Sequence, residues 1–180
     1  MSKTAFIGHR QLCGKGIYQR IENSIEEIIL EQGCNNFTMG TYGEFDNLAL
    51  NACRNLRKKY KDINIEIVFT SLHKIDKYSD YYRDVSTVIY EIEDAHFKTQ
   101  ITLSNRLMID TCDTLICYVD EKKSKSGAKT AMKYAQKIGL KIINLWREED
   151  SVFFGKTKEE IDLLLKEWLL NTDIVKKSNY

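Results

Sequence analysis

Two hydrophobic patterns alternate along the chain. Short runs rich in β-branched and aromatic residues predict six strands, at residues 4–7, 37–39, 63–70, 88–92, 114–119 and 141–146. Between them, apolar residues recur every three or four positions and predict helices around residues 17–28, 45–56, 128–138 and 161–168. A further helix is expected over 97–112, where Thr102, Ser104, Asn105 and Arg106 interrupt the apolar positions.

The alternation of strands with helices decides the fold class. Helical crossovers between consecutive strands predict an α/β protein with a mostly parallel sheet of five or six strands, helices on both faces and right-handed connections. The chain has no proline and no Gly/Ser-rich linker, so we expect one domain over residues 1–170 and a polar tail over 171–180. Residues 71–85, rich in Tyr, have no clear period and are expected to be a surface excursion able to fold over one rim of the sheet.

Composition excludes several classes of protein. Hydrophobic residues are 43% and charged residues 29% of the 180 residues, which is typical of a folded, soluble protein. The net charge of +1 provides no global field, so we expect neither nucleic acid nor a membrane as a partner. The five cysteines form no C-x-x-C pair, and the first ten residues lack the apolar run of a signal sequence. Both observations favour reduced thiols and a cytoplasmic location.

Ligands of parallel sheets bind beyond the carboxyl ends of the strands, so the residues just after each strand are the candidates for function. The first strand is followed by a glycine-rich segment, Gly8 to Gly16, which is neither a Walker A motif nor G-x-G-x-x-G, because five residues separate Gly8 from Gly14. Its glycines let backbone amides approach a ligand, and His9 and Arg10 project from the strand end, where arginine can bind a phosphate. A tight turn with an exposed arginine explains the same residues equally well.

Two other strand ends also lead into helices. After the second strand, Gly40 and Gly43 permit a sharp turn, and Thr41 with the first helical amides can cradle an anion. Glu44 and Asp46 fall in the first helical turn, where the helix dipole stabilises carboxylates whatever their role. After the fifth strand, small residues open a helix within a stretch of five lysines from 122 to 133, as a phosphate site requires, although a solvated basic loop has the same composition. The small residues and the adjoining lysine are Ser126, Gly127, Ala128 and Lys129.

Other candidate chemistry is weaker. His73 and His96 are isolated from further metal-ligating residues, so we expect no metal and no cofactor. Cys13 has no recognisable partner base and is interpreted as structural. The polar cluster Ser104, Asn105 and Arg106 would be explained if it faced the rim of the sheet, while Arg106 by itself fits an exposed position.

The order of these segments resembles the SLOG superfamily of Rossmann-like nucleotide-binding domains. The resemblance rests on GHR after the first strand, then GTYGEFD, SNRLMIDTCDTLICY and SGAKTAMKYA, within roughly residues 3 to 146. The superfamily includes LOG phosphoribohydrolases, DprA-type proteins and small bacterial and phage members. The resemblance implies a Rossmann-like three-layer sandwich that binds a nucleotide or nucleotide-derived signal at the rim. The implied contacts are Gly8, His9, Arg10, Gly40, Thr41, Gly43, Glu44, Asp46, Asn105, Arg106, Ser126, Gly127, Ala128 and Lys129.

The chain departs from the LOG pattern at the residues that would be needed for catalysis. LOG enzymes carry a glycine-rich run followed by a glutamate at the penultimate helix, whereas the corresponding stretch here, SKSGAKTAM, holds no acid. The related nucleoside deoxyribosyltransferases use a nucleophilic glutamate on a similar helix, and Thr130 and Ala131 stand at its matching turn here. Cleavage of an N-glycosidic bond needs a carboxylate, and only Glu44, Asp46 and Asp110 remain to supply it. We therefore expect binding without turnover. The alternative is an N-glycosidase, phosphoribohydrolase or ribosyltransferase that uses Glu44 or Asp46 as its catalytic group.

The apolar helices also predict how the chain assembles. Several largely apolar helices predict more apolar surface than one sheet covers, and relatives in the superfamily often pair through helices. We expect a homodimer that buries on the order of 1,600 Å² through the helix over 97–112 or the one over 45–60.

Overall fold

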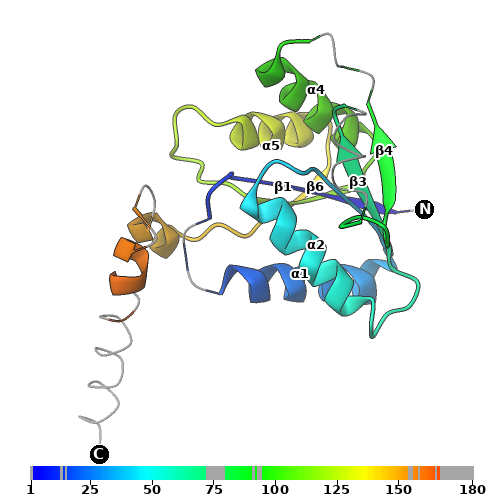
Figure 1. The fold of residues 1–180 in the computed structure, drawn as a ribbon, viewed down its shortest axis with the longest axis horizontal. Coiled ribbons are helices and arrows are strands. Elements are labelled where there is room, and N and C mark those ends of the chain that lie inside the picture. The colour runs from blue at the N-terminus through cyan, green and yellow to red at the C-terminus, as the bar shows by residue number, and fades with distance from the viewer. Residues whose placement is uncertain are drawn as a thin grey trace, which may run out of the picture. The chain divides into compact units, whose positions relative to one another are not determined.

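Six parallel strands form one sheet with helices on both faces (Figure 1). The computed structural model of the protein describes residues 2–12, 14, 16–71, 80–90, 92, 95–153, 156–157, 159–164 and 166. The strands are β1 (Lys3–Gly8), β2 (Asn36–Met39), β3 (Asn64–Phe69), β4 (Ser86–Ile89), β5 (Thr114–Tyr118) and β6 (Lys141–Asn144). The helices are α1 (Ile17–Gln32), α2 (Glu44–Leu56), α4 (Phe97–Asp110) and α5 (Gly127–Lys137). This is a Rossmann-like three-layer sandwich, and the predicted fold class is confirmed.

The strand order is β4-β3-β2-β1-β5-β6. The chain steps outward from β1 through β2 and β3 to β4 and then returns to place β5 on the other side of β1. In the register, Phe6 of β1 lies beside Met39 of β2 and Ile116 of β5. The order of strands therefore reverses between β1 and β5, and in open parallel sheets the crevice at this reversal is where ligands bind.

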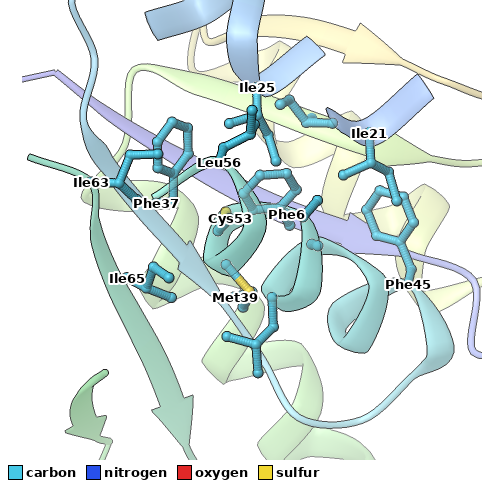
Figure 2. Close-up of a cluster of buried hydrophobic side chains, with 14 of the residues drawn as sticks. Phe6, Ile21, Ile25, Phe37, Met39, Phe45, Cys53, Leu56, Ile63 and Ile65 are labelled. Atoms are coloured by element: carbon cyan, nitrogen blue, oxygen red, sulfur yellow. The ribbon is translucent and has the colours of Figure 1, made fainter. Parts of the chain in front are cut away.

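The core has one cluster on each face of the sheet. Because neighbouring side chains of a strand point to opposite faces, Phe6 of β1 faces α1 and α2 while Ala5 and Ile7 face α4 and α5. Figure 2 shows Phe6 among Ile21, Ile25 and Phe45 from the two helices, all fully buried. The two clusters fix the positions of α2 and α5, whose first residues lie at the carboxyl ends of the strands.

Local signals at the element ends match the sequence. Gly33 follows α1 with φ at 61°, a left-handed conformation that suits glycine, and its amide donates to the carbonyl of Ile29. The strand predicted over 141–146 ends at Asn144, because beyond this residue the Asn144 side chain, in place of strand backbone, bonds the backbone of Val119. Its amide group bonds both backbone groups of Val119, at 3.1 and 2.9 Å, and its Oδ1 accepts from the amide of Trp146 at 3.2 Å.

The described part of residues 71–85 packs beside α2 and β3. Residues 72–79 are outside the described residues, but Asp84 pairs with Arg54 at 2.5 Å and with Arg57, both in or just after the last turn of α2. Since α2 begins at the carboxyl ends of the strands, its last turn lies at their amino ends. Tyr82 also packs edge-on against Phe69, the last residue of β3, and the excursion over the rim stays a prediction.

The chain divides into two compact units, residues 1–12 with 16–146 and residues 13–15 with 147–180. The first unit holds the sheet. The second contains the 3₁₀ helix η1 (Glu148–Phe153) and a helical stretch over 159–164, part of the helix predicted around 161–168. Leu165, Trp168, Cys13 and the predicted tail over 171–180 lie outside the described residues. Within the part of the chain that is described, no helix is long and apolar enough to cross a membrane.

Candidate functional site

A cavity of about 430 Å³ opens at the carboxyl ends of β1 and β5, where the strand order reverses. This volume lies within the range of small-molecule sites. Three segments that the sequence analysis singled out line the cavity together with α4. The lining residues are Phe6, Ile7, Gly8, His9, Arg10, Gly40, Tyr42, Gly43, Asp46, Ile101, Thr102, Ser104, Asn105, Met108, Lys123, Ser126, Gly127 and Ala128.

Gly8 ends β1 and allows α2 to pack closely. A Cβ at this position would lie 2.4 Å from Cγ of Phe45, so only glycine fits beneath that ring. Phe45 in turn stacks on Tyr118 of β5, with ring centroids 6.1 Å apart. Gly8 thus sets the distance between the first turn of α2 and the sheet, which shapes the floor of the cavity.

His9 ties the ends of β1 and β5 together. Its amide donates to the carbonyl of Tyr118 at 3.1 Å, and its Nε2 accepts from the amide of Asp120 at 2.9 Å. Nδ1 lies 3.3 Å from Oγ of Ser126. Burial, reinforced by the positive charge of Lys123 and opposed by Asp120, lowers the pKa of His9 to about 4. At neutral pH the imidazole is therefore uncharged, and it cannot attract a phosphate as a cation.

Arg10 lies in the loop after β1 and Glu44 is the first residue of α2, and the two differ in role. The Arg10 side chain is exposed and lines the cavity, while its carbonyl accepts from the amide of Glu44 at 3.0 Å. The Glu44 carboxylate accepts from the amide of Leu12 at 2.8 Å and is not among the lining residues. Glu44 therefore holds the loop after β1 against the start of α2, and its side chain does not face the cavity.

Asp46 is the carboxylate that faces the cavity within the described part of the chain. Its Oδ2 accepts from the amide of Tyr42 at 2.9 Å, and the amide of Gly43 also donates to this carboxylate. Burial raises the pKa of Asp46 to about 6, against the opposing effect of these two amides. From the sequence, Thr41 and the first helical amides were expected to hold an anion. In the structure, the chain's own carboxylate occupies the amides of Tyr42 and Gly43 just before the helix, and the amide of Glu44 donates to the carbonyl of Arg10. Thr41 is also outside the lining residues, so an external anion is not expected at α2.

The first turn of α5 remains as the anion-compatible element. Ser126 caps the helix, because its Oγ accepts from the amide of Lys129 at 3.2 Å. Ser126 and the next two residues line the cavity. The Lys129 ammonium instead donates to the carbonyls of Glu121 and Lys123, which braces the loop before the helix, and it is Lys123 that reaches the lining.

α4 contributes the remaining wall. Ser104 is buried and Asn105 half-buried, and both line the cavity. The exposed Arg106 turns away, since its guanidinium lies over the Tyr134 ring of α5, 5.4 Å from the centroid. Of the polar cluster predicted here, two residues belong to the site and Arg106 does not.

Seven lining residues were not expected from the sequence, namely Phe6, Ile7, Tyr42, Ile101, Thr102, Met108 and Lys123. A helical signal was available for two of them, because Ile101 and Met108 lie four residues before and three residues after Asn105, on the same side of α4. Tyr42 gave no such signal. Its hydroxyl bonds that of Thr70 at the end of β3, a contact that the sequence does not predict.

The described residues offer no metal centre. Within them, no three His, Cys, Asp or Glu side chains lie close enough to hold an ion. His96 is exposed and His73 lies outside the described residues. Burial raises the pKa of Cys112 to about 11 and of Cys117 to about 12, so neither thiol is ionised at neutral pH.

The cavity thus combines opposite polarities. The capped start of α5, Lys123 and Arg10 favour an anionic group, whereas Asp46 offers an acceptor to hydroxyl or N–H donors. Ile101 and Met108 add apolar surface.

A scan against models of known protein families and a search of curated proteins both find no match. The likeness to the SLOG superfamily accordingly rests on the order of the motifs alone.

Proposed function

We propose that the protein binds a nucleotide or nucleotide-derived signalling molecule in the cavity between β1 and β5, without turning it over. One observation supports this proposal most strongly. The capped start of α5 lines the cavity at the point where the strand order reverses, and Lys123 and Arg10 line it too. A phosphate there meets helix amides that lack intrahelical partners and two positive side chains. The start of α5 also belongs to the SGAKTAMKYA segment, one of the motifs that resemble SLOG domains.

The rest of the cavity suits the remaining parts of a nucleotide. Ile101 and Met108 provide apolar contact for a base, and Asn105 and Asp46 can pair with its N–H groups or with ribose hydroxyls. Binding without turnover is supported by Glu44 facing away, because this leaves Asp46 as the one acidic side chain among the described residues of the lining. Glycosidases commonly use a pair of carboxylates.

Calorimetry against mononucleotides, cyclic nucleotides and ADP-ribose derivatives tests this function. We expect at least one compound to bind, and Arg10→Ala to weaken its binding by roughly tenfold if the guanidinium contacts the phosphate. Arg83→Ala is the matched control, since Arg83 is exposed and does not line the cavity. Absence of binding by every compound would refute the proposal.

Asp46 supports a second candidate, an N-glycosidase or phosphoribohydrolase. A carboxyl with a pKa of about 6 is mostly ionised at pH 7 and can stabilise or trap the oxocarbenium carbon of a nucleotide. Chromatography of nucleoside monophosphates incubated with the protein would then show a free base. Asp46→Asn should abolish its release, while Glu44→Gln should leave it unchanged. Failure of wild-type protein to release any base eliminates this candidate.

We also propose that the protein is a cytoplasmic homodimer. The described cysteines Cys34, Cys53, Cys112 and Cys117 are free thiols, which fits a reducing compartment. The exposed Leu107 on α4, together with the half-buried Leu103 one turn earlier, supports pairing through that helix. Light scattering at micromolar concentration tests this, and a constant mass near 21.0 kDa would contradict it.

A further inference from the structure

We propose that His9 is a positioning residue. Its ring N–H donates a hydrogen bond to Oγ of Ser126, and this directs the serine hydroxyl hydrogen toward a phosphoryl oxygen in the cavity. This inference rests on the proposed function, which supplies the phosphoryl group. It assigns His9 a role different from the direct ligand contact expected from the sequence.

Nε2 of His9 has a backbone partner that fixes its protonation. The atom 2.9 Å away is the backbone nitrogen of Asp120, which can only donate. Nε2 must therefore accept with its lone pair and carries no proton. The ring is buried, with the Lys123 charge nearby, and is neutral at pH 7. A neutral imidazole has one N–H, so its proton is assigned to Nδ1.

Oγ of Ser126 accepts two hydrogen bonds. Nδ1–H points to Oγ of Ser126 at 3.3 Å, and the amide of Lys129 donates to the same Oγ at 3.2 Å. Both donors use the lone pairs of the hydroxyl oxygen. The serine hydrogen is then left to seek a different acceptor, and Ser126 lines the cavity. Ser126 can therefore donate toward a ligand there.

This arrangement also excludes a catalytic dyad. A serine nucleophile needs a base that accepts its proton, but Nδ1 already carries one. The same bonds connect the end of β1 with both ends of the loop between β5 and α5. His9 thus orients the hydroxyl and holds the loop that carries it.

The first experiment needs no ligand. Nitrogen-15 NMR of the histidine rings, with His9 assigned by its loss in His9→Asn, reports which ring nitrogen is protonated. We expect a neutral ring with the proton on Nδ1 between pH 6 and 8. A proton on Nε2, or a charged ring in this range, would overturn the inference.

The second experiment measures affinity with three probes: AMP, ribose 5-phosphate and inorganic phosphate. Losing a hydrogen bond to a charged group weakens binding by about tenfold to a hundredfold, which is the effect expected of Ser126→Ala on every probe that binds. Ser126→Thr keeps the hydroxyl and should retain most of the affinity. Thermal unfolding of each variant identifies losses that come from destabilising α5 rather than from the missing donor.

A double-mutant cycle separates positioning from general support of the fold. His9→Asn can still donate from near the Nδ1 position and should bind more tightly than His9→Gln. Combined with Ser126→Ala, neither His9 change should cost further affinity. Wild-type affinity in Ser126→Ala, or equal losses from His9→Gln with and without Ser126, would overturn the inference while the proposed function stands. If the wild type binds no probe in the cavity, the proposed function fails, and the donor role of Ser126 fails with it.

Discussion

Replacing Asp46 by asparagine should stabilise the protein at neutral pH and leave it unchanged in acid. The half-buried Asp46 lies at the start of α2, and desolvation raises the pKa of its carboxyl from 3.8 to about 6. Asparagine is nearly the same size, and its Oδ1 can accept from the amides of Tyr42 and Gly43 as the carboxylate does. The substitution thus mimics the protonated acid and removes the energetic cost of its ionisation.

The sign and size follow from proton linkage. Between pH 3.8 and about 6 the folded state binds the proton that the unfolded state has released, so stability falls as the pH rises through this window. Over that interval the loss is at most about 3 kcal/mol. A domain of this size shifts its Tm by about 2–4 °C per kcal/mol, which gives Asp46→Asn a gain of up to roughly 10 °C above pH 7.

Urea denaturation from pH 4 to 8 measures the effect as the difference between variant and wild type. That difference should be near zero at pH 4 and reach its maximum above pH 6, whereas other carboxyl groups affect both proteins equally. Asp62→Asn, at an exposed position, is the control and should show no such dependence. Phosphate buffer must be avoided, because phosphate is a candidate ligand. A difference that stays constant across the range would refute the reasoning.

Three further predictions concern packing, the lining of the cavity and the thiols. Gly8→Ala should lower the free energy of unfolding by about 1–3 kcal/mol or more in urea denaturation, because its Cβ would overlap the Phe45 ring, while Gly127→Ala, with no atom within 4 Å of the new Cβ, should cost nothing. Asn105→Ala should weaken binding of whichever nucleotide calorimetry identifies, and Arg106→Ala should not, since only the first lines the cavity; the opposite ranking would show that the cavity is not the binding site. Native protein treated with iodoacetamide and mapped by mass spectrometry should leave four cysteines unmodified until it is unfolded, and rapid labelling would contradict their burial. These are Cys34, Cys53, Cys112 and Cys117.

The strands, the helices and the parallel sheet could be predicted from the sequence, because they depend on interactions between residues that are close along the chain. Buried parallel strands require short apolar runs, and the helices between them require an apolar stripe, so the elements and the parallel sheet followed from periodicity. The rim was predictable for the same reason, since parallel strands place their carboxyl ends together. The segments containing His9, Asp46 and Ser126 were therefore singled out correctly as neighbours that line one cavity.

The direction of individual side chains was less certain. Glu44 and Asp46 are two residues apart, which places them on opposite sides of α2. Asp46 shares the side of the buried Leu50 and Cys53, four and seven residues later, and this spacing is a signal that identifies it as the inward carboxylate. Arg106 and Asn105 are adjacent on α4, and only the packing against α5 fixes which of them faces the cavity.

Charge and protonation depended on tertiary structure alone. The tautomer of His9 is set by Asp120 and Ser126, which are 111 and 117 residues away in the sequence. The raised pKa of Asp46 comes from burial, a property of everything that surrounds it. Hydrophobic period acts between neighbours along the chain and can be recognised in the sequence, whereas desolvation and hydrogen-bond partners exist only once distant segments have come together.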